Sequence, residues 1–559
     1  MYEEPEDRSI RETLLNDTSK IMFRGSDDTT QEEVESRSGP LDHAWKLRTG
    51  VTPHVATSSH SLPPELLALI FGLIVGADPA LNSHLIRVTH VCRYWRDVAL
   101  HTPALWSHIA LMQPAAIEAF LSRSEALPLR ISVNMNAKRG SATPKIMRHQ
   151  ALQMLLDEVA CSRILSLKIV HLPGSDDFYW VMHRIGRASS QLETLSIERR
   201  RFLLPVPNNR SFKPAHFDVP RLRSLKLIGE IPPQFLTVPN ALRTLALVRP
   251  SCDVSTVLNL LERIPALEHL TLCGLPPTIA RAPGKVTLAR LKTVRLQGLP
   301  LRIGPALFSS LVLPSTHTNI SLRDSKLYRR MFQDLVPAHS APDALSFPAL
   351  QGLKHVQLAW KNDLHTLRAY RSSDLAHSGA PALQARAAGG AFREWFLVDW
   401  PIDASHVETV DIYGNSTDSP EIRQQWMWAM MLLGVPALRT LRVRAVPHGI
   451  LQAIISVLGP RTHMMPFPKL EALTVARVLE GRTPCPQLEA LVLAQMPLVG
   501  ESWDTLVSVA VARGPLASGG YLAKITVELP VTETAACDEP ALSRLIKETG
   551  VQIVFTESK

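Results

Sequence analysis

The sequence predicts an α/β fold in which a short all-α module precedes a long array of parallel strands alternating with helices. Two observations predict this fold. Residues 61–110 carry apolar side chains at helical spacing. From about residue 127 onward, a six-residue motif recurs with apolar residues at its first, fourth and sixth positions. A chain of 559 residues exceeds what one hydrophobic core usually serves, whereas a one-dimensional repeat stack has no such limit.

Composition predicts a soluble globular protein of a reducing compartment. Hydrophobic residues make up 45% and charged residues 20% of the chain, which are ordinary values. No two of the six cysteines form a CxxC pair, which favours free thiols. The first residues are acidic and polar where a signal peptide needs basic and then apolar ones, and no apolar run approaches a membrane span. We therefore expect the cytoplasm, the nucleus or both, and no membrane partner.

Charge is divided unevenly along the chain. Residues 1–60 hold twelve acids and seven Lys or Arg, a net charge of −5, so the remainder of this +9 chain carries +14. Residues 1–60 lack sustained apolar periodicity and are rich in Ser, Thr, Asp and Glu, which predicts disorder. A net positive charge on residues 61–559 would attract acidic partners. A basic surface without any particular partner is equally consistent with this net charge.

The module at 61–110 begins with a strong helix signal. Pro64 suits a first helical position, and Glu65 suits the positive end of the helix dipole. Four apolar residues then follow at helical spacing: Leu66, Leu69, Ile70 and Leu73. A second amphipathic helix is predicted from four more: Val88, Val91, Cys92 and Trp95. Pro103 ends this segment, and Leu105–Trp106 is expected to fold back as an apolar latch.

The order LPxELL, Ile-Phe, VCxxW and LW in this module resembles an F-box. That resemblance implies docking onto a Skp-type adaptor and, through it, a cullin. The residues that the resemblance places at the adaptor are Leu62, Pro63, Glu65, Leu66, Leu67, Ile70, Phe71, Val91, Cys92 and Trp95. The alternative is an ordinary helical cap for the array. Trp95 and Trp106 also fit an internal core.

The array at 127–559 is built on the motif LxxLxL. Its copies start at residues 164, 192, 222, 242, 267, 291, 353, 407, 438, 470, 488 and 522. The pattern resembles leucine-rich repeats, and an F-box followed by irregular repeats resembles fungal proteins of that kind. We therefore predict a solenoid with helices at Val254–Ile264 and Leu451–Leu458, and a closing helix, Gly turn and strand. Residues 371–392 are predicted to be an irregular, flexible insertion.

The repeats indicate where a substrate could bind. The residue between the two inward strand positions points to the opposite, concave face. Basic residues at such positions make a candidate substrate face: Lys168, Lys226, Arg295 and Arg442. They suit an acidic or phosphorylated protein segment. Solvated strand residues without a ligand are the alternative.

Five tryptophans lie close together in the second half of the array. They are Trp360, Trp395, Trp400, Trp426 and Trp428. Aromatic side chains make good anchors for a partner, so a recognition pocket is one interpretation. The other is that these side chains pack an irregular insert against the array.

Motifs that carry chemistry are absent from the sequence. There is no HExxH, GxSxG, GxGxxG or GxxxxGK[ST], and no Cys/His zinc spacing. We therefore expect no catalytic residue, cofactor or metal, and no nucleic-acid partner. The function predicted is a non-catalytic substrate-recognition adaptor of a Skp–cullin–F-box ubiquitin ligase. The alternatives are a repeat scaffold outside any ligase and, in a third class, an enzyme with an unrecognised site.

Overall fold

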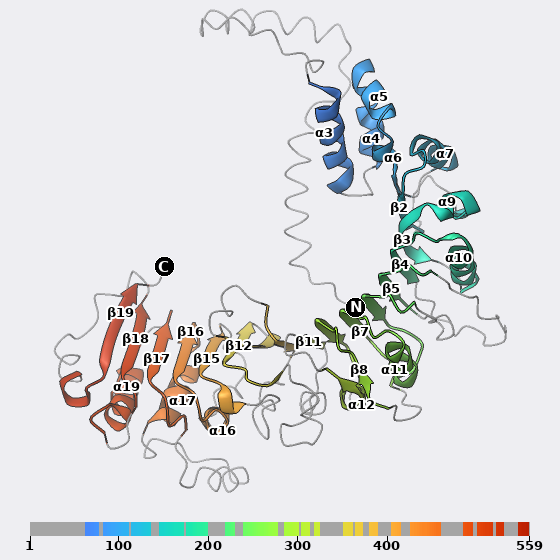
Figure 1. The fold of residues 1–559 in the computed structure, drawn as a ribbon. Helices are drawn as coiled ribbons and strands as arrows, with labels where there is room; N and C mark the ends of the chain where they lie inside the picture. The colour runs from blue at the N-terminus through green and yellow to red at the C-terminus, as the bar shows by residue number, and fades with distance from the viewer. Residues whose placement is uncertain are drawn as a thin grey trace, which may run out of the picture. The chain divides into compact units, whose positions relative to one another are not determined.

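The computed structural model is a mixed α/β structure with a helical N-terminal region (Figure 1). The residues described are 62–77, 82–110, 113–135, 145–172, 175–199, 219–229, 239–277, 284–300, 303–313, 318–324, 350–361, 364–372, 380–388, 404–414, 425–459, 484–495, 500–517, 521–529 and 546–557. The chain divides into two compact units. One comprises Met1–Leu73 with Arg87–His101, and the other Ile74–Ile86 with Thr102–Lys559. The segment predicted to be disordered, 1–60, lies outside the described residues.

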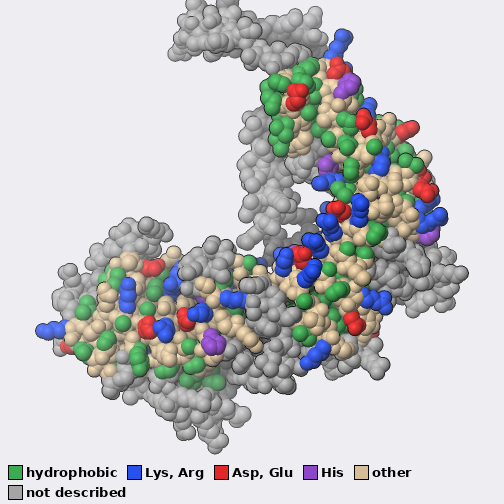
Figure 2. All heavy atoms as spheres, in the orientation of Figure 1, with side chains coloured by type: hydrophobic (Ala, Val, Ile, Leu, Met, Phe, Trp, Pro, Cys, Tyr) green, Lys and Arg blue, Asp and Glu red, His purple; other side chains and the backbone are tan. Residues whose placement is uncertain are grey.

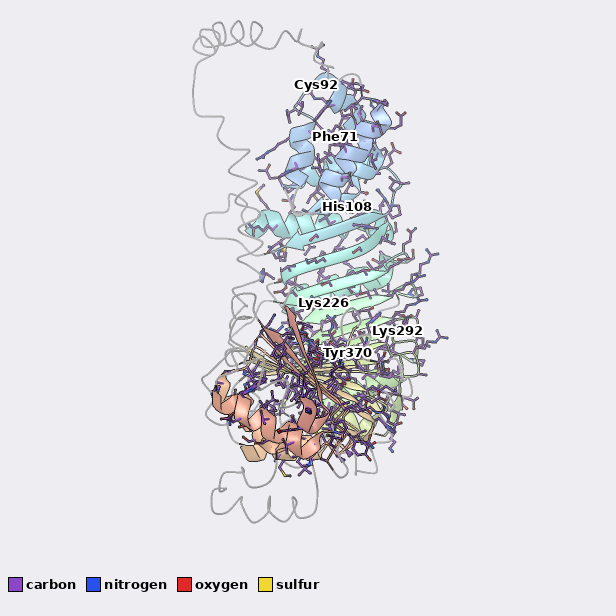
Figure 3. The ribbon with its side chains drawn as sticks, turned by 90° about the vertical axis from the view of Figure 1, so that its left-hand side faces the viewer. Phe71, Cys92, His108, Lys226, Lys292 and Tyr370 are labelled. Atoms are coloured by element: carbon purple, nitrogen blue, oxygen red, sulfur yellow. The ribbon has the colours of Figure 1, made fainter. Side chains whose placement is uncertain are left out.

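The helices of the N-terminal region are α3 (Pro64–Ala77), α4 (Asn82–Val88) and α5 (Arg93–Leu100). The prediction of one helix through Val88 and Trp95 is wrong, because α4 ends at Val88. Cys92 adopts an extended conformation, with φ −156°, and caps α5 (Figure 3). Its Sγ accepts a hydrogen bond from the Trp95 backbone N–H at 3.4 Å. Cys92 is therefore a capping residue and not part of an apolar helix face.

The second unit is organised around a 17-stranded sheet. From one end to the other, its strands are β1 (His108–Ala110), β2 (Leu129–Asn134), β3 (Ile164–Leu172), β4 (Thr194–Arg199), β5 (Ser224–Ile228), β6 (Thr244–Val248), β7 (His269–Cys273), β9 (Thr293–Gln297), β11 (Asn319–Asp324), β14 (Leu383–Ala388), β13 (Leu364–Tyr370), β12 (His355–Lys361), β15 (Thr409–Gly414), β16 (Thr440–Arg444), β17 (Ala490–Ala494), β18 (Lys524–Leu529) and β19 (Gln552–Glu557). Every LxxLxL copy within the described residues contains a strand; the copy at 470–475 lies outside them. The sequence motif therefore predicts most of the sheet.

The middle of the sheet departs from a simple repeat. Strands β12, β13 and β14 form an antiparallel meander, so β13 runs against its neighbours. The meander enters the sheet in reverse chain order, because β14 pairs with β11 and β12 pairs with β15. The prediction that 371–392 is a flexible insertion needs correction, since Leu383–Ala388 within it forms β14. Buried Leu383 and Ala385 alternate there with Gln384 and Arg386, a short, Ala-rich signal.

Helices cover one side of the sheet, as α10, α11, α17 and α19 show in Figure 1. The helices of this unit are α6 (Pro103–Trp106), α7 (Pro114–Arg123), α8 (Lys145–Leu155), α9 (Glu158–Ser162), α10 (Ser175–Ala188), α11 (Val254–Glu262), α12 (Ile303–Ser310), α16 (Gln425–Leu433), α17 (His448–Leu458) and α19 (Gly500–Arg513). Helices α11 and α17 match the two predicted from sequence. Near the end of the chain, Gly550, with φ +69°, lies two residues before the start of β19, in line with the predicted Gly turn and strand. A separate two-stranded sheet pairs β8 (Val286–Thr287) with β10 (Leu311–Val312).

The core of this unit consists of the apolar pairs that the strands turn inward. Leu225 and Leu227 of β5, and Leu245 and Leu247 of β6, are all at most 2% exposed. Alternate residues of each strand point the other way and form what we call the polar face of the sheet. The latch residue Trp106 is also buried, with its ring 4.8 Å from that of Phe120.

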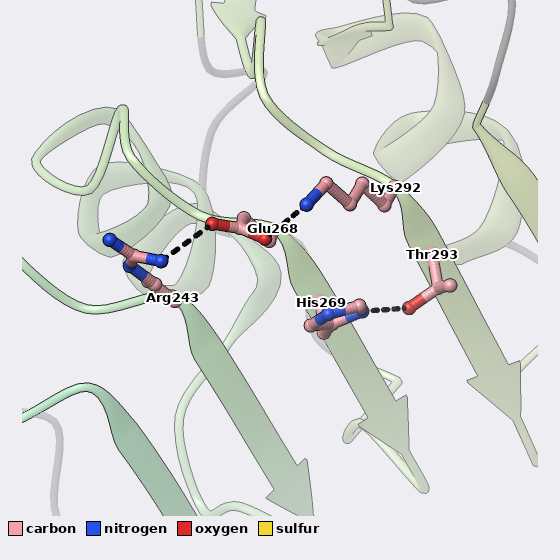
Figure 4. Close-up of polar contacts among 5 residues, drawn as sticks. All are labelled: Arg243, Glu268, His269, Lys292 and Thr293. Carbon is pink, nitrogen blue, oxygen red and sulfur yellow. Dashed lines mark hydrogen bonds and ion pairs between the residues drawn. The ribbon is translucent and has the colours of Figure 1, made fainter. Parts of the chain in front are cut away.

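Strand register is reinforced just before β7 begins. The backbone N–H groups of Glu268 and His269 both donate to the Arg243 carbonyl, at 2.7 and 2.9 Å. Side chains add to this, because Glu268 bonds Lys292 at 2.6 Å and lies 3.4 Å from Arg243 (Figure 4). The hydrogen bond from Lys292 is the main reason that the pKa of Glu268 lies below its usual value.

The described tryptophans of the Trp-rich region pack internally. Trp360 and Trp428 are at most 1% exposed, and their ring centroids are 6.2 Å apart. Trp395 and Trp400 lie outside the described residues, and the side chain of Trp426 is not described. For the described pair, packing is the correct interpretation.

We predict that Gly414→Ala destabilises the second unit by about 1–3 kcal/mol. Gly414 is the register partner of Trp360, and a Cβ added there would overlap the indole ring. Urea unfolding measures the change. Gly284→Ala is the matched control, because an added Cβ there meets nothing within 4 Å. Equal stability of the two variants would contradict this account of the packing.

Candidate functional site: an exposed apolar face on helix α3

Helix α3 carries two apolar stripes that point in different directions. One is made of Leu67 and Phe71, which are four residues apart and at most 1% exposed. The ring of Phe71, which is labelled in Figure 3, packs with its centroid 5.3 Å from that of Trp95 on α5. This stripe forms the core of the helical unit. It also frees the rest of the helix surface for other contacts.

The other stripe faces solvent. We call it the α3 apolar face; it consists of Leu62, Leu66, Leu69, Ile70 and Leu73. Leu69 is 61% and Leu73 69% exposed, which is unusual for adjacent large apolar side chains. Figure 2 shows apolar side chains gathered over α3 around an acidic group. The chain before the helix is held by Tyr94, whose hydroxyl donates to the Leu62 carbonyl at 2.7 Å.

The structure divides the ten residues predicted to contact an adaptor. Six are exposed: Leu62, Pro63, Glu65, Leu66, Ile70 and Val91. Cys92 and Trp95 are half-buried. The prediction needs correction for Leu67 and Phe71, whose side chains lie in the core and offer no surface to a partner. Leu69 and Leu73 are not among the ten predicted residues, but they are exposed on the same helical face as Leu66 and Ile70, as their spacing indicates.

The four basic residues of the predicted substrate face lie on the polar face of the sheet, in four different strands. Lys168, Lys226 and Arg295 are exposed, and Figure 3 shows Lys226 on the sheet. Arg442 differs, because its Nη1 lies 3.9 Å from the Asp411 carboxylate. Asp411 is itself buried, with its other oxygen 3.2 Å from His355 Nε2. Arg442 is therefore partly neutralised, whereas Arg295 forms no ion pair with a described residue.

The described groups offer little for bond chemistry. Burial raises the pKa of the Cys252 thiol to about 11 and that of Cys485 to about 12, so both thiols are protonated at neutral pH. Ser502 Oγ lies 2.8 Å from His448 Nε2, but Ser502 is fully buried between α17 and α19. No three described His, Cys, Asp or Glu residues are grouped to hold a metal. No described helix is long and apolar enough to span a membrane.

Comparison with known families identifies the N-terminal module. Residues 59–112 match the F-box-like family model. This segment is an F-box-like domain. It contains α3 and α5, and thus the α3 apolar face. No curated protein shows a significant match to the chain.

We predict that Leu67→Ala destabilises the F-box-like domain by about 2–5 kcal/mol, because it leaves a cavity in the core. Leu69→Ala, on the exposed stripe of the same helix, should change stability by less than about 0.5 kcal/mol. Amide hydrogen exchange over residues 62–77 measures both effects. Similar amide exchange rates in the two variants would contradict the assignment of Leu67 to the core and of Leu69 to the exposed stripe of α3.

Proposed function

We propose that the chain is the substrate-recognition subunit of a Skp–cullin–F-box ubiquitin ligase and catalyses no reaction itself. The observation that carries the proposal is the α3 apolar face, which is exposed within an F-box-like domain. A monomeric protein seldom leaves such a face open unless a partner covers it. Domains of this family generally bind Skp-type adaptors, which makes such an adaptor the partner we propose.

The α3 apolar face has the energetic capacity for docking. Burying one large aliphatic side chain contributes roughly 1.5–3 kcal/mol. A few such residues at the centre of an interface can dominate its affinity. We infer that Leu66, Leu69 and Leu73 on α3 have this role, which their exposure supports; Glu65 and Val91 are exposed in the same domain.

In this proposal the second unit binds the target protein. We infer that its sheet is an irregular leucine-rich-repeat solenoid, supported by the coincidence of LxxLxL copies with parallel strands. The polar face offers a long surface of outward side chains. By holding a target near the ubiquitin-charged enzyme, the chain raises the effective concentration of the two reactants. Action in the cytoplasm or nucleus is part of this proposal.

The combined change Leu66→Asp and Leu69→Asp should weaken binding of a purified Skp-type adaptor at least about a hundredfold. Each change removes roughly 1.5–3 kcal/mol of apolar burial, and 1.4 kcal/mol corresponds to a factor of ten. Calorimetry with the full chain measures the affinity. Val159→Asp is the control, since Val159 on α9 is 73% exposed but lies in the other unit.

Affinity capture from cells then separates a ligase from a scaffold. Recovery of both adaptor and cullin with the wild-type chain, and of neither with the double variant, is the expected result. Recovery of adaptor without cullin supports a scaffold outside any ligase. If neither is recovered with the wild-type chain, the proposed function is wrong.

A further inference from the structure

Four arginines lie on the polar face of four neighbouring strands. They are Arg295 on β9, Arg323 on β11, Arg386 on β14 and Arg368 on β13. Arg295 and Arg323 are exposed, and the other two are half-buried. We call this group the arginine patch. It forms because the meander enters the sheet in reverse order, which places β14 next to β11 and β13 on the other side of β14.

The register of the sheet sets like charges against each other. Arg323 and Arg386 are direct partners across β11 and β14. Like charges directly opposite one another are unfavourable in a sheet. Arg386 is also held in place. With the oxygen and nitrogen of the Gln384 amide exchanged, the Gln384 oxygen accepts hydrogen bonds from Arg386 Nε and Nη2 at 3.0 and 3.2 Å.

Arg368 is held in a similar way, because its Nη1 donates to Gln357 Oε1 on β12 at 3.1 Å. Thus two of the four guanidiniums are oriented by neutral amides, which leave the positive charge uncompensated. Some basic residues at strand starts, in contrast, are paired with acids. Lys292, Lys354 and Arg439 each lie within 3.5 Å of a glutamate carboxylate.

No acid occupies a described polar-face position on the four strands of the arginine patch. The described neighbours are Thr293, Gln297, Asn319, Ser321, Thr366, Tyr370 and Gln384. The nearest acid in the same register row is Asp411, two strands beyond β13. That carboxylate already lies beside His355 and Arg442. The described part of the patch is therefore strongly positive.

We propose that the arginine patch binds an extended, carboxylate-rich peptide segment that runs across the strands. The patch supplies one guanidinium per strand in two adjacent register rows, with Arg295 and Arg368 in one row and Arg323 and Arg386 in the other. Neighbouring strands lie about 4.8 Å apart, so the charge is spread across the strands and not concentrated at one point. A row of carboxylates matches such a spread of charge better than one phosphate does, and each carboxylate can take the paired N–H groups of a guanidinium. Single-stranded nucleic acid is typically bound by stacking its bases on exposed aromatic side chains. Tyr370, the aromatic residue among the described polar-face positions of these strands, is 4% exposed.

This inference rests on the proposed function in one respect, which is that the bound peptide segment would be part of the protein that the ligase targets. Peptide binding by itself requires no adaptor. It can therefore be measured on the full chain alone, separately from adaptor capture.

The test is fluorescence anisotropy with a short labelled peptide of alternating Glu and Ser. We expect saturable binding that weakens as salt rises, and no binding of the matching Gln and Ser peptide. Arg295→Glu combined with Arg386→Glu should weaken binding about a hundredfold. Arg295→Gln combined with Arg386→Gln should give a smaller loss in the same direction, which guards against misfolding of the charge-reversed variant.

Arg187→Glu combined with Arg263→Glu is the matched control. It makes the same change in net charge at two exposed positions, one on α10 and one at the C-cap of α11, and should bind as the wild type does. Equal losses in the control and patch variants would overturn the proposal, because only net charge would matter. Tighter binding of a singly phosphorylated Gln and Ser peptide, or of a short RNA, would also overturn it. Retained adaptor capture by the patch variants separates this failure from failure of the proposed function.

Discussion

The second unit depends on one constraint, which is that its apolar strand pairs cannot be buried without a neighbouring repeat. A pair such as Leu245 and Leu247 is at most 1% exposed because strands on both sides and helices on one face surround it. The helices and paired carbonyls hold these strands in register, and register in turn places the polar-face residues in rows. The arrangement of any binding surface on this sheet is therefore a consequence of core packing.

The F-box-like domain uses large apolar side chains both for its core and on its surface. Helix α3 is apolar on two sides, and only the Leu67 and Phe71 side is used for the core. The other side carries Leu66, Leu69 and Leu73 into solvent. Because the core stripe is satisfied within the domain, the exposed stripe is available for a partner without any unfolding. This separation within one helix is what makes an adaptor role physically reasonable.

The sequence predicted which residues are buried where a local motif determines burial. It did not predict this where burial depends on strands that are distant in sequence. LxxLxL predicted the inward pairs, and LPPELL predicted the start of α3. Helical spacing gathered Leu66, Leu69, Ile70 and Leu73 on one face but could not say whether that face was covered. The motif order placed Leu67 and Phe71 at a partner, although they pack inside. Strand β14 and the opposition of Arg323 and Arg386 arise from the reversed meander, which no local pattern encodes.

Hydroxyl-radical footprinting of the full chain, with and without a purified Skp-type adaptor, tests at the side chains themselves whether an adaptor covers the α3 apolar face. We expect oxidation of Leu66, Leu69 and Leu73 to fall in the complex, while that of Leu516, which is as exposed as Leu73 at 69%, does not change. Tight adaptor binding with unchanged oxidation of the three α3 leucines would show that the adaptor binds elsewhere.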